Sequence, residues 1–215
     1  MLEVELKCPL TAEMWPKLQI QLQRMSKLSV KSSIDRYYDT PHLEFLRHPC
    51  SVFVRLREER HLQVKFDECE SDDEQIPCVE RGFLITEDHL PEEAHLLVRH
   101  FMPRWQAAST WTEAVKRNEL EVLACIQKTR VSYTDGTMLI SVDRVAGLGD
   151  FVEAEIQCDE GTDTQSALTR VQMFLSELGG KPLRAGYTEL WLYQHHPQAY
   201  EQVPARFRVN ETDLQ

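Results

Sequence analysis

The sequence predicts an α+β fold in which an antiparallel sheet of about eight strands closes into a β-barrel, with helices packed outside it. Most of the well-patterned segments alternate apolar and polar residues with a period of two, as β-strands do. A few segments instead repeat apolar residues at three- and four-residue steps, as amphipathic helices do. The residues that alternate with the apolar ones in the strands are mostly charged. They would converge on one lumen if the apolar face of the barrel points outward, under the helices.

Composition excludes several classes of protein. The chain has 215 residues, of which 42% are hydrophobic and 27% are charged, so it is too apolar to be disordered. It lacks a run of about 18 apolar residues, which a membrane span needs. The net charge of −11 argues against non-specific binding to nucleic acid. We therefore expect one globular domain over residues 1–200, followed by a tail over residues 201–215.

The start of the chain and its cysteines predict the compartment. The opening MLEVELK carries acids where an export signal would need an apolar core. The six cysteines show neither a CxxC pair nor a metal-ligand spacing. We expect a cytoplasmic protein whose cysteines are free thiols.

Three segments have helical spacing. Apolar residues recur at helical steps over residues 11–28, with Thr11 as the expected cap. A second helix is expected over about Pro91–Phe101. A third runs through Leu168 and Leu178 and should end at the glycine pair 179–180.

The strands carry charge on their second face. In the first strand, Glu3, Glu5 and Lys7 alternate with Leu2, Val4 and Leu6. The later strands show the same alternation, with charged residues in this order: Arg55 and Arg57, Lys65, Lys128 and Arg130, Asp143, Glu153 and Glu155. Such charges could be only the wet face of a half-exposed sheet. Their grouping by sign within strands favours a shared site instead.

A lumen with these charges suits one chemistry. Burying unpaired charges is costly, so water or a ligand must compensate them. Clustered carboxylates are typical ligands of Mg²⁺ or Mn²⁺. Clustered arginines and lysines bind phosphate, because a guanidinium fork pairs with two phosphate oxygens at once. The two sets together predict a metal–polyphosphate site.

These residues resemble the signatures of the CYTH superfamily, the triphosphate tunnel metalloenzymes. The opening Glu3-x-Glu5-x-Lys7 is similar to the ExExK signature, and the YYDTP segment at residues 37–41 is similar to a second family segment. The remaining strand charges follow in family order, and the match runs from Glu3 to about Tyr193. The resemblance implies an eight-stranded closed β-barrel, the triphosphate tunnel. Within the YYDTP segment we expect a structural role, in which Asp39 or Thr40 bonds backbone amides at a turn.

Within the superfamily, the chain most resembles the thiamine-triphosphatase branch. The stretch from Leu190 to Tyr200 is similar to that branch's ending. Its members carry an aromatic residue, usually Trp, two positions before the first arginine of the RxR strand, and here that residue is Phe53. Phe53 could stack on a thiamine ring or serve only as barrel packing. Arg184 stands near the place of a basic residue that the family has before a Ser-Tyr pair.

The resemblance also implies the role of each site residue. The expected metal ligands are Glu3, Glu5, Asp143, Glu153 and Glu155, and the cofactor is Mg²⁺, with Mn²⁺ as a substitute. The expected substrate-binding residues are Lys7, Phe53, Arg55, Arg57, Lys65, Lys128, Arg130 and Arg184. Catalytic roles fall to Lys65 and Glu5, and Glu80 is a further candidate after the acidic loop.

The implied function is metal-dependent hydrolysis of a triphosphate to diphosphate and orthophosphate, with thiamine triphosphate as the preferred substrate. Three alternatives stay open: an inorganic triphosphatase, a class IV-type adenylate cyclase, and a non-catalytic polyphosphate-binding module. We expect a monomer whose partner is a small-molecule triphosphate, with neither nucleic acid nor membrane as a partner.

Overall fold

The computed structural model describes residues 2–67, 78–158, 164–183, 185–205 and 208–209, with the side chains of residues 2, 3, 67 and 78 left out. The chain forms two compact units. Unit 1 comprises residues 1–32, 127–190 and 206–215, and unit 2 comprises residues 33–126 and 191–205. Each unit has its own hydrophobic core.

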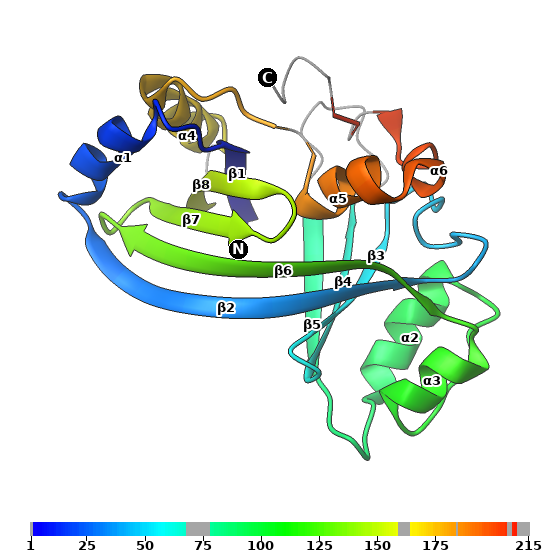
Figure 1. Ribbon diagram of the computed structural model, residues 1–215. Coiled ribbons are helices and arrows are strands. Elements are labelled where there is room, and N and C mark those ends of the chain that lie inside the picture. The colour runs from blue at the N-terminus through cyan, green and yellow to red at the C-terminus, as the bar shows by residue number, and fades with distance from the viewer. Residues whose placement is uncertain (1, 68–77, 159–163, 184, 206–207, 210–215) are drawn as a thin grey trace. The chain divides into compact units, whose positions relative to one another are not determined.

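Eight strands form one antiparallel sheet, in the order β1-β8-β7-β6-β2-β3-β4-β5 (Figure 1). The strands are β1 (Leu2–Pro9), β2 (Ser26–Asp39), β3 (Phe53–Arg57), β4 (His61–Asp67), β5 (Cys78–Leu84), β6 (Glu121–Thr134), β7 (Leu139–Val145) and β8 (Gly149–Cys158). The expected antiparallel sheet of eight strands is thus confirmed. Within the described part of the chain, the strand order has β1 and β5 as its ends, so closure of the barrel stays a prediction.

The helices are α1 (Trp15–Leu22), α2 (Glu92–Phe101), α3 (Trp111–Arg117), α4 (Thr164–Leu178), α5 (Tyr187–His195) and α6 (Pro197–Tyr200). The apolar faces of α1, α2, α3 and α4 cover apolar faces of the strands, as expected from the period-two pattern. The helices expected near residues 91–101 and 168–178 are confirmed as α2 and α4. Gly179, with a φ of 91°, follows the last residue of α4 in the left-handed conformation that glycine favours.

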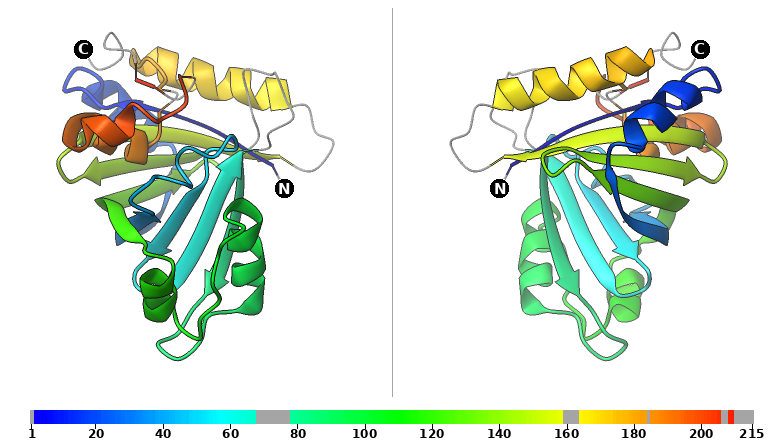
Figure 2. Two further views of the ribbon diagram at one scale, coloured as in Figure 1. Left: turned by 90° about the vertical axis from the view of Figure 1, so that its right-hand side faces the viewer. Right: turned by 90° about the vertical axis from the view of Figure 1, so that its left-hand side faces the viewer.

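In unit 1, α1 and α4 cover the apolar face of β1, β8 and β7 (Figure 2). Alternate residues of β8, Val152 and Ala154, are fully buried beneath Val171 and Leu175 of α4. Burying a valine or leucine side chain in this way stabilises the fold by about 1.5–3 kcal/mol. This packing fixes which face of β8 turns away from the helices, and that face carries Glu153 and Glu155.

In unit 2, α2 and α3 pack on β3 and β4. Val54 and Leu56 of β3 and Val64 of β4 are buried against a cluster that includes Val98 and Trp111. The residues of β3 that alternate with Val54 and Leu56 therefore point to the other face of the sheet. These residues are Phe53, Arg55 and Arg57.

The turn after β2 is held by one carboxylate. Asp39 accepts hydrogen bonds from the backbone N–H groups of Thr40, Phe45 and Leu46 at 2.7, 3.0 and 2.8 Å. The side chain of Thr40 accepts a further bond from the backbone N–H of Glu44 at 3.3 Å. These contacts confirm the structural role expected for the YYDTP segment.

The helix expected over residues 11–28 is shorter than the pattern predicts. It spans Trp15–Leu22 and its N-cap is Met14, which makes no side-chain capping bond, so the expectation of Thr11 as the cap is wrong. Met25 closes the last turn, and the chain then enters β2, where Leu28 is exposed. Pairing of β2 within the sheet overrides the helical spacing of the last apolar residues.

Cysteine usage also departs from expectation. Cys8, Cys125 and Cys158 are free thiols, whereas Cys50 is in a disulfide. The expectation that every cysteine is a free thiol is therefore wrong. Among the helices described, none combines the length and the apolar character needed to cross a membrane.

Candidate active site

Unit 1 presents a charged face whose residues are aligned by strand register. Glu5 and Lys7 of β1 stand opposite Glu155 and Glu153 of β8. Because side chains alternate along a strand, all four lie on the face away from α4. Lys7 Nζ lies 3.1 Å from Glu5 Oε1 and 3.8 Å from Glu153 Oε2.

Arg130 binds two carboxylates of this face. It stands directly opposite Asp143 in the β6–β7 ladder. Its Nε and Nη2 atoms donate to the two oxygens of Asp143 at 2.7 and 2.6 Å, and Nη2 also lies 2.7 Å from Glu153 Oε1. This fork is the bidentate geometry that gives arginine its preference for planar anions.

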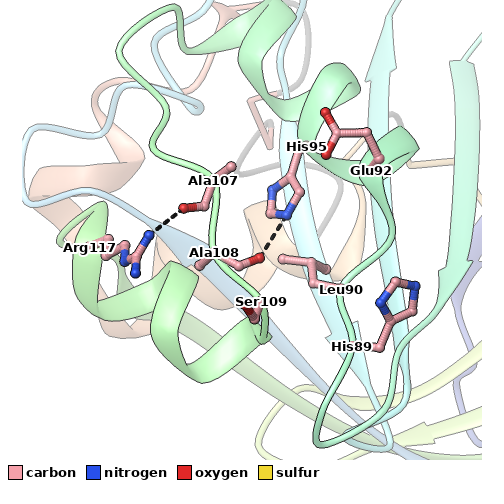
Figure 3. Close-up of a pocket in the computed structure, with 8 residues that line it drawn as sticks. All are labelled: His89, Leu90, Glu92, His95, Ala107, Ala108, Ser109 and Arg117. Atoms are coloured by element: carbon pink, nitrogen blue, oxygen red, sulfur yellow. Dashed lines mark hydrogen bonds between the residues drawn. The ribbon is translucent and has the colours of Figure 1, made fainter.

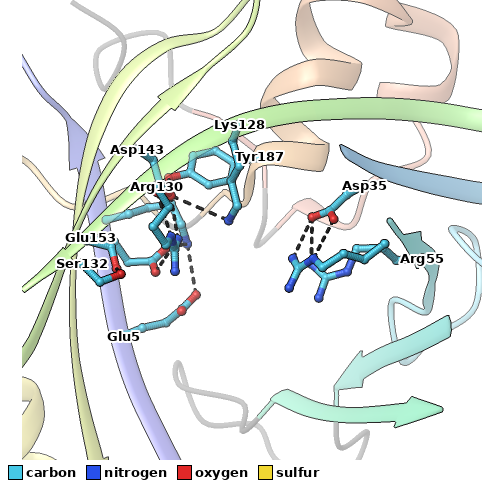
Figure 4. A network of polar contacts seen from close by, with 12 residues as sticks. Glu5, Asp35, Arg55, Lys128, Arg130, Ser132, Asp143, Glu153 and Tyr187 are labelled. Carbon is cyan, nitrogen blue, oxygen red and sulfur yellow. Dashed lines mark hydrogen bonds and ion pairs between the residues drawn. The ribbon is translucent and has the colours of Figure 1, made fainter. Parts of the chain in front are cut away.

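Tyr187, the first residue of α5, joins the same group of side chains (Figure 4). Its hydroxyl donates to Asp143 Oδ2 at 2.8 Å. Lys128 Nζ lies 3.8 Å from the same oxygen. The Asp143 carboxylate is thus surrounded by donors, and it is completely buried.

Three glutamates of this face form a candidate cation site. One carboxylate oxygen from each of Glu5, Glu153 and Glu155 lies within 4.8 Å of the other two. Glu153 is 4% exposed and Glu155 is 6% exposed. Hard divalent cations such as Mg²⁺ take oxygen ligands of this kind, so the donor set fits such an ion.

Burial sets the electrostatics of these carboxylates. Burial raises the pKa of Glu153; Lys7 and Arg130 oppose this rise, and the negative charge of Glu5 adds to it. Burial also tends to raise the pKa of Asp143, but the hydrogen bonds and charge of Arg130 outweigh it and hold the pKa below its ordinary value. Arg130 thus favours the anionic form of Asp143, whereas burial and the charge of Glu5 favour the protonated form of Glu153.

Tyr187 and Arg130 keep their protons in this environment. Burial and the negative charges of Asp143 and Glu153 raise the pKa of Tyr187 well above its ordinary value. Burial tends to lower the pKa of Arg130, but its bond to Asp143 and the charge of Glu153 raise it overall. Tyr187 is thus a hydrogen-bond donor to Asp143 rather than a phenolate.

The charged face of unit 2 is built around Asp35 of β2. Asp35 stands opposite Arg57, whose Nε and Nη2 atoms donate to its two oxygens at 2.7 Å each. Arg55 Nη1 lies 3.6 Å from Asp35 Oδ2. One buried carboxylate, 2% exposed, therefore orients both arginines of the RxR strand. Figure 4 shows Asp35 beside Arg55.

Further polar side chains hold Arg55. Its Nε, Nη1 and Nη2 atoms donate to Gln63 at 3.0 Å, to the Tyr37 hydroxyl at 3.3 Å and to Glu80 at 3.1 Å. Gln63 also donates to Glu80. Burial tends to lower the pKa of Arg55, but the negative charge that Tyr37, Glu80 and Asp35 can carry raises it overall.

The aromatic candidate of unit 2 lies beside this network. The rings of Phe53 and Tyr37 meet edge to face with centroids 6.1 Å apart. Phe53 stands opposite Lys65 on β4, and Lys65 stands opposite Glu80 on β5. Phe53 and Lys65 are both half-buried.

The structure therefore places the expected site residues in two groups. Unit 1 brings together Glu5, Lys7, Lys128, Arg130, Asp143, Glu153 and Glu155. Unit 2 brings together Phe53, Arg55, Arg57, Lys65 and Glu80. The side chain of Glu3 and all of Arg184 lie outside the described residues. The interpretation of the charges as a merely wet face is wrong for Asp143, Glu153 and Glu155, which are buried.

Sequence reasoning missed several residues of these groups. Asp35 alternates in step with Tyr37, so the period-two pattern could have placed it on the charged face. The pattern does place Gln63 on the same face as Lys65, but not its hydrogen bond with Arg55. Tyr187 carries no period-two signal, because it lies on a helix 44 positions along the chain from Asp143. The one pointer to it is its place shortly after Arg184, where the family has a Ser-Tyr pair.

A separate cavity in unit 2 has different chemistry (Figure 3). It is an open pocket of about 360 Å³, lined in part by His89, Glu92 and His95. Both ring nitrogens of His95 are engaged, with the Ala108 carbonyl at 2.9 Å and with the indole N–H of Trp105 at 3.0 Å. His95 is therefore a satisfied core histidine, and we assign the cavity no role.

A sequence model of the CYTH domain matches residues 1–184. The chain belongs to the CYTH family. Solved structures agree with this fold. A conserved hypothetical protein from Pyrococcus furiosus is 22% identical and covers 87% of this chain and 99% of its own, with a TM-score of 0.56. Two proteins from Pyrococcus horikoshii OT3 are 20% and 19% identical and cover 90% and 88% of this chain and 99% of their own, with TM-scores of 0.61 and 0.57. Among curated proteins, none matches this CYTH chain.

Proposed function

We propose that this CYTH protein is a metal-dependent triphosphatase that hydrolyses thiamine triphosphate to thiamine diphosphate and orthophosphate. One observation carries the proposal: the three-glutamate cluster and the arginine fork of Arg130 share one face of unit 1. Glu153 belongs to both, because its carboxylate lies 2.7 Å from Arg130 and within the cation cluster. A metal–phosphate complex needs this combination of anionic and cationic donors.

The proposed metal is Mg²⁺, for which Mn²⁺ can substitute. Glu5, Glu153 and Glu155 would hold it, and Glu3 and Asp143 belong to the same proposed set, directly or through water. When bound, such an ion neutralises phosphate charge and lowers the pKa of a bound water. It would also offset the burial that raises the pKa of Glu153.

The cations of each unit have proposed phosphate-binding roles. In unit 1 these are Lys7, Lys128 and Arg130, and in unit 2 they are Arg55, Arg57 and Lys65, with Arg184 as a further candidate. The arginines are already oriented by carboxylates, so little rotamer freedom is lost when phosphate binds. Phosphoryl transfer depends chiefly on such positioning and charge neutralisation.

Glu5 and Lys65 are the proposed catalytic residues. The Glu5 side chain is 31% exposed, more than that of Glu153, so a water molecule can reach it. It would accept the proton of that water, and Lys65 would stabilise negative charge that develops on the phosphate chain.

Phe53 supports the preference for thiamine triphosphate. Its ring lies on the same strand face as Arg55, beside Tyr37, so it can contact the organic end of a ligand whose phosphates bind the arginines. An inorganic triphosphate has no ring for this contact.

The decisive experiment incubates the protein with thiamine triphosphate, inorganic triphosphate or ATP and with Mg²⁺, Mn²⁺ or EDTA, and identifies the products. We expect metal-dependent release of orthophosphate, fastest with thiamine triphosphate. Faster hydrolysis of inorganic triphosphate would make the protein an inorganic triphosphatase, and pyrophosphate with cyclic AMP would make it an adenylate cyclase. Binding without turnover of any substrate would leave a polyphosphate-binding module.

A matched control keeps this experiment specific. Glu153→Gln removes one ligand of the proposed metal, whereas Glu44→Gln removes a carboxylate that pairs with Arg104 elsewhere in the protein. Only the first substitution should abolish turnover.

The proposal also includes a monomeric state, a cytoplasmic location, and neither nucleic acid nor membrane as a partner. The net charge of −11 supports the absence of nucleic-acid binding. The disulfide at Cys50 argues against the cytoplasmic location, because disulfides are more typical of an oxidising compartment. Cell fractionation with thiols blocked at lysis tests the location.

A further inference from the structure

Tyr187 contacts three charged side chains of unit 1. It is buried, and its hydroxyl donates to Asp143 Oδ2 at 2.8 Å. The Nζ atoms of Lys128 and Lys7 lie 5.3 and 5.7 Å from the centroid of its ring. Figure 4 shows Lys128 beside the ring. Both distances are within the range of cation–π attraction.

The hydroxyl acts on Arg130 through a carboxylate. Asp143 uses both oxygens to hold the guanidinium group of Arg130. A donor on Oδ2 limits rotation of this carboxylate, and the carboxylate in turn fixes the plane of the guanidinium group. The orientation of Arg130 thus depends on Tyr187, with the Asp143 carboxylate as the link between them.

The ring acts on the two lysines. Ammonium groups on flexible four-carbon chains lose substantial rotamer entropy when they bind phosphate. A ring that attracts both groups restrains them before a ligand arrives. This effect needs the aromatic ring but not the hydroxyl.

We infer that Tyr187 is a positioning residue of the triphosphate site, whose hydroxyl orients Arg130 through Asp143 and whose ring places Lys7 and Lys128. The inference rests on the proposed function. The two parts are separable, because Tyr187→Phe keeps the ring and loses the hydroxyl, whereas Tyr187→Leu loses both.

The test measures kcat and KM for inorganic triphosphate with Mg²⁺, and the Kd of inorganic triphosphate in EDTA by titration calorimetry. For Tyr187→Phe we expect kcat to fall about tenfold with the Kd within about twofold of wild type, because a misoriented Arg130 fails chiefly in the transition state. For Tyr187→Leu we expect the same loss of kcat and a Kd about tenfold weaker. The control Tyr193→Phe removes a hydroxyl from the same helix, where the ring packs on Tyr200, and should change neither value.

Two results would overturn the inference while leaving the proposed function intact: wild-type kcat in Tyr187→Phe, or equal Kd values for Tyr187→Phe and Tyr187→Leu. If Tyr187→Leu fails to fold, as circular dichroism would show, Tyr187→Met replaces it as the variant without a ring. A wild-type protein that binds triphosphate without hydrolysing it overturns the proposed function and the role of the hydroxyl in turnover. The Kd comparison still decides the role of the ring in that case.

Discussion

Arg130 and Asp143 stand directly opposite each other on neighbouring strands and are joined by two hydrogen bonds of 2.7 and 2.6 Å. The pair is internal to the sheet ladder, so the strand register itself sets its geometry. Arg130 also reaches Glu153 at 2.7 Å, which links the guanidinium group to the candidate cation site.

This geometry predicts that Arg130→Lys is not a conservative change. Lysine keeps the positive charge but cannot make the bidentate contact. We expect kcat/KM for triphosphate to fall at least about tenfold. A tenfold loss corresponds to about 1.4 kcal/mol of transition-state stabilisation. Steady-state kinetics measure the change, with Arg144→Lys, whose partner Asp150 lies outside the site, as the control. Equal losses in the two variants would contradict a specific role for the Arg130 fork.

Metal dependence should change when a buried glutamate loses its charge. Glu155→Gln keeps the size of the side chain and removes one anionic ligand of the proposed ion. We expect turnover to be abolished at limiting Mg²⁺ while the fold stays intact, as shown by far-ultraviolet circular dichroism. Wild-type activity across a Mg²⁺ titration would remove Glu155 from the set of metal ligands.

The metal-free protein should lose stability as the pH rises, partly because of Glu153. Its pKa is raised above the ordinary value of 4.5 in the folded protein. A carboxyl group with a raised pKa contributes stability that is fully present below pH 4.5 and is lost as the pH rises through its folded pKa. Glu153→Gln is neutral at every pH, so its Tm should exceed that of wild type by a margin that grows with pH. Each unit of pKa shift is worth about 1.4 kcal/mol, or about 3–6 °C in a chain of this size.

Thermal melting in EDTA between pH 4.5 and 8 measures this margin. The ion pairs of Glu153 with Arg130 and Lys7 form only when Glu153 is ionised, and their effect is already included in the net rise of its pKa. Any difference between Gln and Glu that does not depend on pH shifts the whole curve without changing its slope. The slope of the difference is therefore the readout. Parallel curves for wild type and Glu153→Gln would contradict the prediction.

Substrate choice should depend on Phe53. If its ring stacks on thiamine, Phe53→Ala should lower kcat/KM for thiamine triphosphate by about tenfold, from a contact worth on the order of 1 kcal/mol. Hydrolysis of inorganic triphosphate should change much less. Phe53 also packs edge to face on Tyr37, so the ratio of the two substrates is the informative quantity. Equal losses on both substrates would mean that the ring serves only in packing and would favour the inorganic triphosphatase.

The buried carboxylate of unit 2 should matter although it touches no phosphate in our proposal. Asp35→Asn leaves Arg57 with a neutral partner that cannot accept both of its bonds. We expect the Kd of inorganic triphosphate to weaken by about three- to tenfold, as for a lost charge-assisted bond. Calorimetry measures it, and Asp135→Asn, in the turn between β6 and β7, is the control. An unchanged Kd for Asp35→Asn would show that the arginines need no such support.

Much of this fold could be predicted from local pattern. Alternation over Val54, Arg55 and Leu56 sets which side chains are buried and which reach the charged face, and the structure agrees. Periodicity carries this information because burial in a strand repeats every two residues. It could not set the end of α1, since apolar residues near Met25 fit a helix and a strand equally well, and the sheet decided the matter.

The site was predictable only where strands supplied it. Glu153 and Arg130 follow from alternation and from the family signature, whereas Tyr187 belongs to the site through tertiary folding alone. No local pattern relates a helical tyrosine to a strand aspartate. The pairing of Asp35 with Arg57 is intermediate, because alternation gives the face but not the register.

The β1–β8 register also governs which changes of chain length the protein can tolerate. Glu5 pairs with Glu155 across the two strands, and Lys7 pairs with Glu153. Leu6 and Ala154, which form the pair between these two, face the helices. Deleting one residue within β8 would exchange the two faces beyond that point, turning a carboxylate onto the apolar surface of α4 and an aliphatic side chain onto the charged one. The same deletion in a turn, such as the one at Gly136, would leave the alternation of side chains within each strand in place. Laboratory variants that gain or lose residues should therefore survive at the turns and fail in β1 and β8, whichever amino acid is added or removed.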